Sequence, residues 1–211
     1  TKGCTSPSDN DEEDSAVVAC NDLIDNDGDG RIDYDPDPAL GDPGCDSNTD
    51  TSERSSSLIC DNGSDDDDDG QADYSPTAGQ GDPGCSAPDD GDGSERCTPG
   101  SIGCPDCDNG IDDDSDGIAD YTQTDPDPGC DDAYDTSERG TPVCDNGADD
   151  DGDGFSDYPD DPGCYGPGDS SERDPNLVCD NGLDDDNDGL FDFPEDFGCA
   201  SLLDADNSER C

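Results

Sequence analysis

The chain has 211 residues, with 63 Asp and Glu against 7 Lys and Arg, so its formal net charge is −56. This charge excludes nucleic acid and anionic membranes as electrostatic partners. Only 25% of the residues are hydrophobic and no His, Met or Trp is present, so burial of apolar surface cannot order the chain by itself.

The cysteine content points to another source of order. There are 14 cysteines, an even number at a density typical of disulfide-stabilised proteins from oxidising compartments. We therefore expect a secreted, extracellular protein in which disulfides and divalent cations replace most of the hydrophobic core. The longest apolar run, Ala16 to Cys20, is too short for membrane insertion. Because the sequence starts at Thr1 rather than at Met, we also expect that a signal peptide has been removed or left out.

An acidic lead-in, residues 1–19, precedes five copies of one unit. The unit reads C-D-N-G-x-D-x-D-x-D-G-x-x-D-Y, then a spacer, then D-P-G-C and D-x-S-E-R. We assign repeat 1 to 20–59, repeat 2 to 60–96, a disulfide junction to 97–106, repeat 3 to 107–143, repeat 4 to 144–178 and repeat 5, with a C-terminal junction cysteine, to 179–211. Such periodicity predicts a linear array of small units.

Regular secondary structure should be minimal, because no window has a sustained helical period and Gly and Pro interrupt every unit. The predicted fold class is mostly irregular loop: five small repeats, stapled by disulfides and calcium, in an extended rod. At most, two- or three-residue strands are expected at the apolar residues that lead into each unit. Ile24, Ile111 and Leu183, together with the aromatic residue after each acidic run, are expected to pack on the local disulfide.

Each unit carries D-x-D-x-D-G-x-x-D, in which the acids at positions 1, 3 and 5 can surround an ion. Gly at position 6 permits the sharp turn that lets the carbonyl of position 7 coordinate. Hard oxygen ligands in flexible loops favour calcium, whereas zinc favours Cys or His. We expect five or more calcium ions, held by the aspartates Asp25, Asp27, Asp29, Asp33, Asp65, Asp67, Asp69, Asp73, Asp112, Asp114, Asp116, Asp120, Asp149, Asp151, Asp153, Asp157, Asp184, Asp186, Asp188 and Asp192. The position-7 carbonyls belong to Arg31, Gln71, Ile118, Phe155 and Leu190.

These loops resemble the calcium repeats of the thrombospondin type 3 family, which string D-x-D-x-D-G-x-x-D-x-x-D loops along a disulfide-linked chain with little secondary structure. The units are also similar to C-D-N-G-x-D-D-D-x-D-G-x-x-D-Y-P-x-D-P-G-C repeats of large secreted bacterial proteins. The resemblance covers about residues 20–211 and implies the metal chemistry. The cysteine positions differ from those of thrombospondin, so no partner is carried over.

Calcium takes about six to eight oxygen ligands, so each loop needs more than its own aspartates. We expect the glutamate of D-x-S-E-R to bend back across the disulfide and complete the shell; these are Glu53, Glu95, Glu138, Glu172 and Glu209. The acid of D-P-G is expected to hold a second ion with the acid of D-x-S; the D-P-G acids are Asp42, Asp82, Asp127 and Asp161. Five of the seven basic residues share one repeat position and are expected to hold carboxylates or carbonyls of a neighbouring unit: Arg54, Arg96, Arg139, Arg173 and Arg210.

Ten cysteines occupy the two repeat positions, and pairing within units is the simplest arrangement: Cys20–Cys45, Cys60–Cys85, Cys107–Cys130, Cys144–Cys164 and Cys179–Cys199. Of the other four, Cys97 and Cys211 follow S-E-R, and Cys4 and Cys104 follow Gly. The two ends of the chain thus carry the same halves as the internal junction. We expect Cys97 to bond Cys104, and Cys211 to bond Cys4 of the next molecule in a head-to-tail homopolymer. The alternatives are an intrachain Cys4–Cys211 bond and a bond between Cys4 and another of these four cysteines.

The sequence therefore predicts an extracellular calcium-binding structural protein, a subunit of a fibre or filament. The alternatives are a calcium-dependent binding or adhesion module, a spacer in a cell-surface protein, and a calcium buffer or mineral-nucleating protein. An enzyme is not expected, since the chain has no His and no lone nucleophile, and its acids are spaced for metal rather than for a catalytic cleft.

Overall fold

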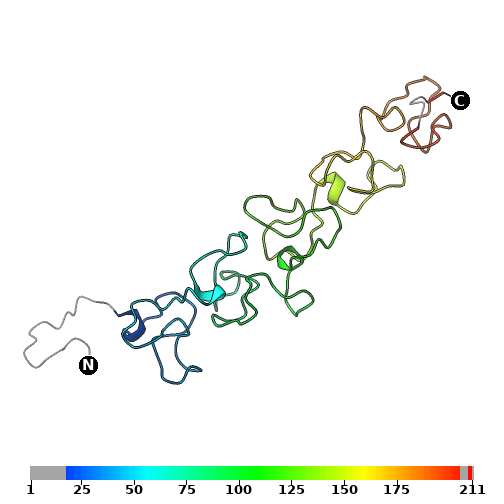
Figure 1. The fold of residues 1–211 in the computed structure, drawn as a ribbon. Coiled ribbons are helices and arrows are strands. Elements are labelled where there is room, and N and C mark those ends of the chain that lie inside the picture. Colours follow the sequence, from blue (N-terminus) through cyan, green and yellow to red (C-terminus); the bar gives the residue numbers. More distant parts are fainter. Residues whose placement is uncertain (1–17, 205–208, 211) are drawn as a thin grey trace, which may run out of the picture. The chain divides into compact units, whose positions relative to one another are not determined.

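The structure, a computed structural model, describes residues 18–204 and 209–210 (Figure 1). The chain divides into two compact units. The first, Thr1–Thr98, contains repeats 1 and 2, and the second, Pro99–Cys211, contains repeats 3 to 5. The same local architecture recurs in each repeat.

Regular structure in the described residues is limited to four single-turn 3-10 helices. These are η1 (Ala19–Asn21) and η2 (Ile59–Asp61) in the first unit, and η3 (Asp106–Asp108) and η4 (Val143–Asp145) in the second. Each contains the first cysteine of its repeat. The prediction of a loop-rich, disulfide-stapled fold is thus confirmed.

The short strands predicted at the start of each unit are wrong, because the backbone groups there bond within their own repeat. The N–H of Cys20 donates to the carbonyl of Asp50 at 3.3 Å, and the carbonyl of Cys20 accepts the N–H of Tyr34 at 3.0 Å. The second contact recurs in every repeat, from Tyr74, Tyr121, Tyr158 and Phe193 to the first cysteine. Because the backbone N–H and carbonyl groups of the first cysteine are hydrogen-bonded within the repeat, they need no partner strand.

Five disulfides close the five repeats, and they join the cysteines that the repeat spacing pairs. They are Cys20–Cys45, Cys60–Cys85, Cys107–Cys130, Cys144–Cys164 and Cys179–Cys199. Cys97 and Cys104 are disulfide-bonded as well. The expected Cys211–Cys4 bond lies outside the described residues.

In each repeat, the segment that carries the second cysteine (D-P-G-C in repeats 1 to 4) packs directly against the S-E-R segment. A Cβ placed on Gly44 would lie 1.5 Å from the carbonyl oxygen of Glu53. The equivalent distance is 1.4 or 1.5 Å at Gly84, Gly129, Gly163 and Gly198. Only glycine permits this backbone contact, so the sequence motif follows from the closure of each repeat.

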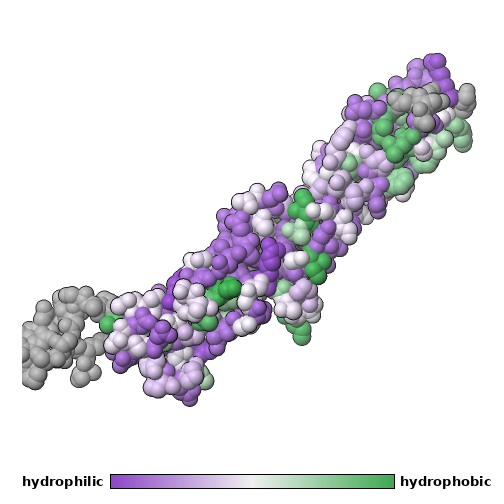
Figure 2. Space-filling view, viewed as in Figure 1, coloured by the Kyte–Doolittle hydropathy of each residue, from purple (hydrophilic) through white to green (hydrophobic). Residues whose placement is uncertain are grey.

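The interior of each repeat consists of cystine and carboxylate side chains rather than of aliphatic ones. The largest fully buried side chains are all Glu or Asp, and most of the buried residues classed as hydrophobic are cysteines. Figure 2 shows a surface that is mainly hydrophilic, with small separate hydrophobic patches.

The predicted packing of Ile24, Ile111 and Leu183 on the disulfides is wrong, since these side chains are 56%, 43% and 59% exposed. Each follows an Asx turn in which its N–H donates to the side chain two residues earlier. Carboxylates occupy the space next to the disulfides instead. Their buried negative charge is costly unless a positive charge compensates it.

Candidate metal centre

The aspartates at positions 1, 3 and 5 of the first loop curl the backbone around themselves. Asp25 accepts the N–H groups of positions 4 and 6 at 2.7 and 3.1 Å. Asp27 accepts the N–H of position 5 at 3.2 Å, and Asp29 that of position 7 at 2.5 Å. The other four loops repeat the contacts from positions 6, 5 and 7. Each loop therefore holds its three carboxylates in a shared, preformed arrangement.

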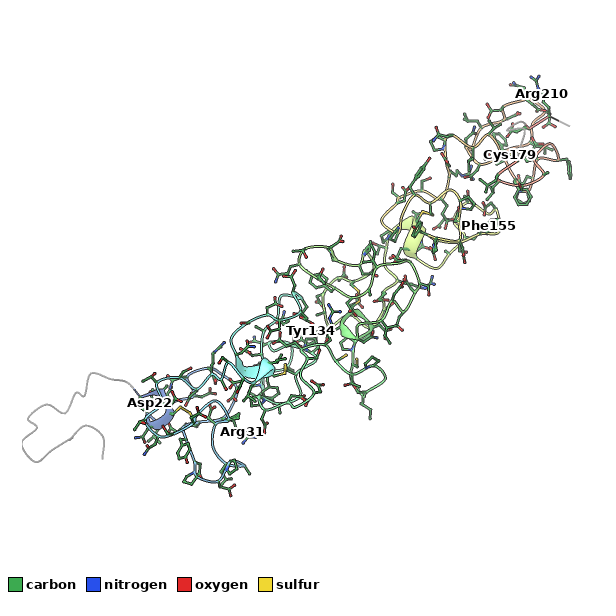
Figure 3. All side chains as sticks on the ribbon, in the orientation of Figure 1. Asp22, Arg31, Tyr134, Phe155, Cys179 and Arg210 are labelled. Carbon is green, nitrogen blue, oxygen red and sulfur yellow. A yellow bond between two sulfur atoms is a disulfide. The ribbon has the colours of Figure 1, made fainter. Side chains whose placement is uncertain are left out.

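Position 6 has the backbone conformation that the sequence predicts. Its glycines have φ between +87° and +95°, a region that L side chains rarely adopt. At position 7 the side chain faces outward in the fourth loop, where Phe155 is 42% exposed. Figure 3 labels Phe155 and its counterpart in the first loop, Arg31. The position-7 carbonyls as ligands stay a prediction.

Several of these acidic groups could hold a metal ion. One carboxylate oxygen from each of Asp25, Asp27 and Asp29 lies within 4.8 Å of the others, and Asp65, Asp67 and Asp69 form the same group in the second loop. Within these loops, buried carboxylate oxygens that accept no hydrogen bond occur in Asp29, Asp69, Asp112, Asp116 and Asp153. A buried carboxylate oxygen without a donor is costly unless a cation meets it, so the residues present fit a hard divalent ion.

The electrostatics of the loops agree with this reading. Burial is the largest cause that raises the pKa of Asp29 and of Asp69 to about 6, and the neighbouring aspartates of the same loop raise it further. Crowded carboxylates that resist ionisation gain stability when a divalent cation is placed among them.

The five S-E-R glutamates reach back to the loops, as expected, and are at most 2% exposed. The carboxylate of Glu53 accepts the N–H of Asn26 at 2.5 Å and that of Asp33 at 2.9 Å. Glu95, Glu138, Glu172 and Glu209 bond the same two loop positions, 2 and 9, in their own repeats. These glutamates therefore clamp the two ends of each loop, and their role as ligands stays a prediction.

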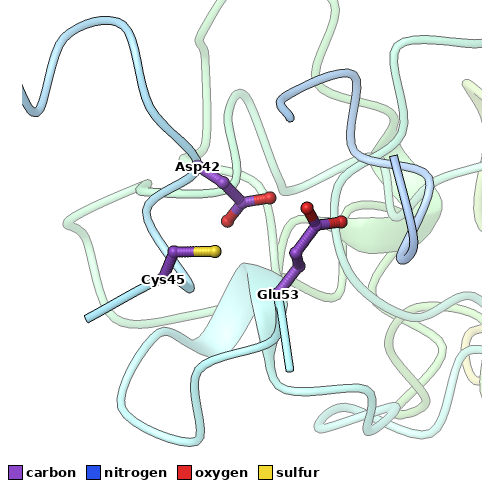
Figure 4. A group of neighbouring side chains, drawn as sticks. All are labelled: Asp42, Cys45 and Glu53. Carbon is purple, nitrogen blue, oxygen red and sulfur yellow. The ribbon is translucent and has the colours of Figure 1, made fainter. Parts of the chain in front are cut away.

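At least two of these glutamates, Glu53 and Glu172, also lie close to the acid of D-P-G. Single ligand atoms of Asp42, Cys45 and Glu53 lie within 4.8 Å of one another, and Figure 4 shows the two carboxylates turned toward a common space. The sulfur of Cys45 belongs to the disulfide with Cys20 and is no thiolate ligand. Only oxygen donors remain, which suits calcium or magnesium rather than zinc.

The aspartate at position 9 accepts hydrogen bonds from the turn at the start of its repeat. The carboxylate of Asp157 accepts the N–H groups of Asn146 and Gly147 at 2.9 and 2.8 Å, and it pairs with Arg139 at 2.8 Å. Asp33, Asp73, Asp120 and Asp192 likewise accept N–H groups of the turn after the first cysteine. These aspartates therefore anchor that turn, and their role as metal ligands stays a prediction.

Three of the five S-E-R arginines pair with the following repeat, as the sequence predicts. Arg54 pairs with Asp73 at 2.9 Å, Arg139 with Asp157 at 2.8 Å, and Arg173 with Asp192 at 3.2 Å. In each case the aspartate is the position-9 residue of the following repeat. Arg96 lies 4.0 Å from Asp67 of its own repeat.

The acids of D-P-G are deeply buried. Asp42 is 4% exposed, its Oδ1 accepts the N–H of Gly44 at 2.7 Å, and its Oδ2 accepts no hydrogen bond. The Oδ2 atoms of Asp127, Asp161 and Asp196 are also buried without a donor. The D-x-S acid Asp50 caps the N–H of Thr51 and presents its carbonyl to Cys20, and the second ion that D-P-G and D-x-S acids are expected to share stays a prediction.

Sequence reasoning missed one set of buried acids, the aspartates that directly follow the first cysteine. Asp61, Asp108, Asp145 and Asp180 are at most 2% exposed. A signal for them exists in the sequence, because repeats 2 to 5 carry Asp at this position whereas repeat 1 carries Asn21.

Across the described parts of the chain, no helix has the length and apolarity that crossing a bilayer requires. Comparison with protein-family models, with curated proteins and with solved structures finds no match.

Proposed function

We propose that this chain is a secreted calcium-binding structural protein whose repeats are ordered jointly by disulfides and calcium. The observation that carries the proposal is the composition of its interior, where the largest fully buried side chains are glutamates and aspartates. Buried carboxylates without a counter-charge oppose folding, and the chain has only 7 basic residues against 63 acidic ones. Divalent cations supply the missing positive charge.

Calcium is the preferred ion for three reasons. The available donors are oxygens, the loops are irregular, and calcium tolerates the flexible geometries that magnesium does not. Disulfides are typical of oxidising, extracellular surroundings, where carboxylate-rich modules bind calcium with Kd values of about 10⁻⁴ to 10⁻³ M. The disulfides and the carboxylate-rich loops thus favour the same location, outside the cell.

Calcium titration of the unreduced chain tests the metal assignment. Isothermal calorimetry is expected to show at least one calcium per D-x-D-x-D-G loop, with weaker binding of magnesium at the same concentration. No calcium uptake at millimolar concentration would refute it.

We further propose that chains join head to tail into a fibre through Cys211 and Cys4. The support is the matching sequence around Cys97 and Cys104, S-E-R-C and G-C, which the two ends of the chain repeat. Non-reducing electrophoresis of native material is expected to show a ladder that collapses to one band on reduction. A single monomer band without reductant would contradict this part.

A further inference from the structure

The acid that follows the first cysteine of a repeat is buried against the preceding repeat. Asp61 belongs to repeat 2 and is 2% exposed. Its Oδ2 accepts the N–H of Ser55, the residue directly after the arginine of repeat 1, at 3.1 Å. A Cβ on Gly44 of repeat 1 would lie 2.7 Å from the same Oδ2. The aspartate thus reaches across the boundary between two repeats.

Two acids of repeat 1 meet Asp61 at this boundary. One carboxylate oxygen from each of Asp27, Asp42 and Asp61 lies within 4.8 Å of the others. The carboxyl groups of Asp61 and Asp27 also come within hydrogen-bonding distance. Two carboxylates can share such a contact only when a proton or a cation lies between them.

An unpaired oxygen points into this group. Asp42 is 4% exposed, and its Oδ2 is buried without a hydrogen-bond donor. The two basic side chains nearby in sequence are engaged elsewhere, since Arg54 pairs with Asp73 and Arg31 donates to the carbonyl of Ala39. Three acids with a buried, donor-free oxygen among them form a site for a cation rather than for a neutral group.

The second unit has related acid contacts at two further boundaries. Asp145 of repeat 4 contacts Asp114 and lies near Asp127, both of repeat 3, and the Oδ2 of Asp127 accepts no hydrogen bond. Asp180 of repeat 5 contacts Asp151 of repeat 4. Each of these aspartates also accepts the N–H after the preceding arginine, from Gly140 and Asp174 respectively.

Backbone hydrogen bonds cross two of these boundaries, from the N–H of Ser55 to the carbonyl of Asp61 and from that of Gly140 to the carbonyl of Asp145. The five disulfides given above each join cysteines of one repeat, so none of them ties a repeat to the next. The arginine pairs do cross the boundaries, but their guanidinium side chains are 43% to 48% exposed, and ion pairs at that exposure contribute only about 0–1 kcal/mol.

We infer that each of these three boundaries holds a second class of calcium site, in which an ion joins aspartates of one repeat to one of the next and shares the position-3 aspartate with the loop. This inference rests on the proposed calcium binding and adds its position and role. Calcium at these sites fixes consecutive repeats to each other, whereas calcium in the loops orders each repeat internally. The boundary sites contain Asp27, Asp42 and Asp61; Asp114, Asp127 and Asp145; and, between repeats 4 and 5, Asp151 and Asp180.

The test removes only the acid that the following repeat contributes. A triple variant, Asp61→Asn, Asp145→Asn and Asp180→Asn, leaves every loop aspartate in place. The matched control is Asp46→Asn, Asp89→Asn and Asp131→Asn, which makes the same charge change at three exposed positions. Calcium bound per chain is counted by native mass spectrometry at a free calcium concentration that saturates the unmodified chain.

The triple variant is expected to bind three fewer calcium ions than the control and to keep its loop sites. Limited proteolysis in calcium is expected to cut it between repeats, around 55–59, 140–143 and 174–178, where the control resists. Equal calcium counts in variant and control would overturn the inference while leaving the proposed function intact. Absence of calcium from the unmodified chain would overturn both.

A single substitution covers the case in which the triple variant does not fold. Asp180→Asn alters one boundary only, and it is expected to lose one ion and to gain one cleavage site between repeats 4 and 5. If this variant retains the full calcium count, the boundary site does not exist.

Discussion

The glycine of each D-P-G-C segment is required for a different reason than the glycine at position 6 of the loop. At Gly163 a Cβ would lie 1.5 Å from the backbone oxygen of Glu172, whereas at Gly154 nothing lies within 4 Å of an added Cβ but φ is +95°. The first position is limited by space and the second by backbone conformation. Two otherwise identical substitutions therefore separate the two effects.

Gly163→Ala is expected to destabilise repeat 4 by more than about 3 kcal/mol, because neither of the two clashing backbone segments can move without opening the repeat. Gly154→Ala should cost about 1–2 kcal/mol from left-handed strain alone. Differential scanning calorimetry in calcium compares them. An equal or smaller effect at Gly163 would show that the close contact is absent.

The buried glutamates give a second test on single side chains. Glu172 accepts N–H groups from both ends of its loop, Asp150 and Asp157. Glu172→Gln replaces one acceptor oxygen by an NH₂ group that faces a donor, so we expect a loss of about 1–3 kcal/mol in stability and weaker calcium binding by the fourth loop. Calorimetric titration and thermal unfolding measure both.

Asp131→Asn serves as the control, because Asp131 is exposed and lies outside the D-x-D-x-D-G loops and the clamp. Its calcium titration and unfolding temperature should match those of the unmodified chain. Should Glu172→Gln behave like this control, the clamp would contribute nothing to the loop.

Repeat 1 departs from the other repeats at two positions that, in later repeats, lie at a boundary. Later repeats begin C-D-N-G, and their Gly leaves room for the arginine of the preceding repeat: a Cβ on Gly63 would lie 2.4 Å from Nη1 of Arg54. Repeat 1 has Leu23 at this position and Asn21 at the boundary-acid position. Both departures fall where a later repeat receives side chains from its predecessor.

Arg173 offers a test of this boundary. It pairs with Asp192 of repeat 5 at 3.2 Å and lies 3.8 Å from Asp151 of repeat 4. Arg173→Gln should lower stability by about 1 kcal/mol or less, given its exposure, and should speed proteolysis between repeats 4 and 5. Arg31→Gln, in an arginine that serves its own repeat, is expected to leave that cleavage rate unchanged. No difference between the two variants would argue against a boundary role.

Repetition explains which elements could be predicted from the sequence. The five disulfides and the positive-φ glycine at position 6 recur in register, so spacing alone identifies them. Spacing cannot reveal how a carboxylate is used, because the same group can accept N–H groups or bind a cation; the N–H donors of Asp157 and Glu172 therefore became visible only in the structure. The contact of Asp61 with Asp27 depends on how two repeats meet, which no pattern within one repeat contains.

Taken together, the buried acids make the stability of the calcium-free chain depend on pH in an unusual direction. Burial raises the pKa of Asp42 and Asp127 to about 7, and burial together with a neighbouring carboxyl raises the pKa of Asp61 and Asp145 to about 8. The folded chain therefore retains protons that the unfolded chain releases above its ordinary value of 3.8. Stability falls as pH rises through this window.

In EDTA, the unreduced chain is thus expected to unfold at a lower temperature at pH 8 than at pH 5. In excess calcium the order should reverse, because the ion binds the ionised carboxylates. Calorimetric scans at both pH values provide the comparison. A chelated chain that is more stable at pH 8 would mean that the acids are not buried as described.

Amide hydrogen exchange of the whole unreduced chain, in calcium and in EDTA, tests most directly whether ions replace an apolar interior. With calcium, we expect strong protection of the N–H groups that close each repeat, including those of Cys20, Tyr34 and Asp42. In EDTA, with the disulfides intact, this protection should fall strongly in all five repeats. Protection that stays unchanged after complete removal of the ions would contradict the account.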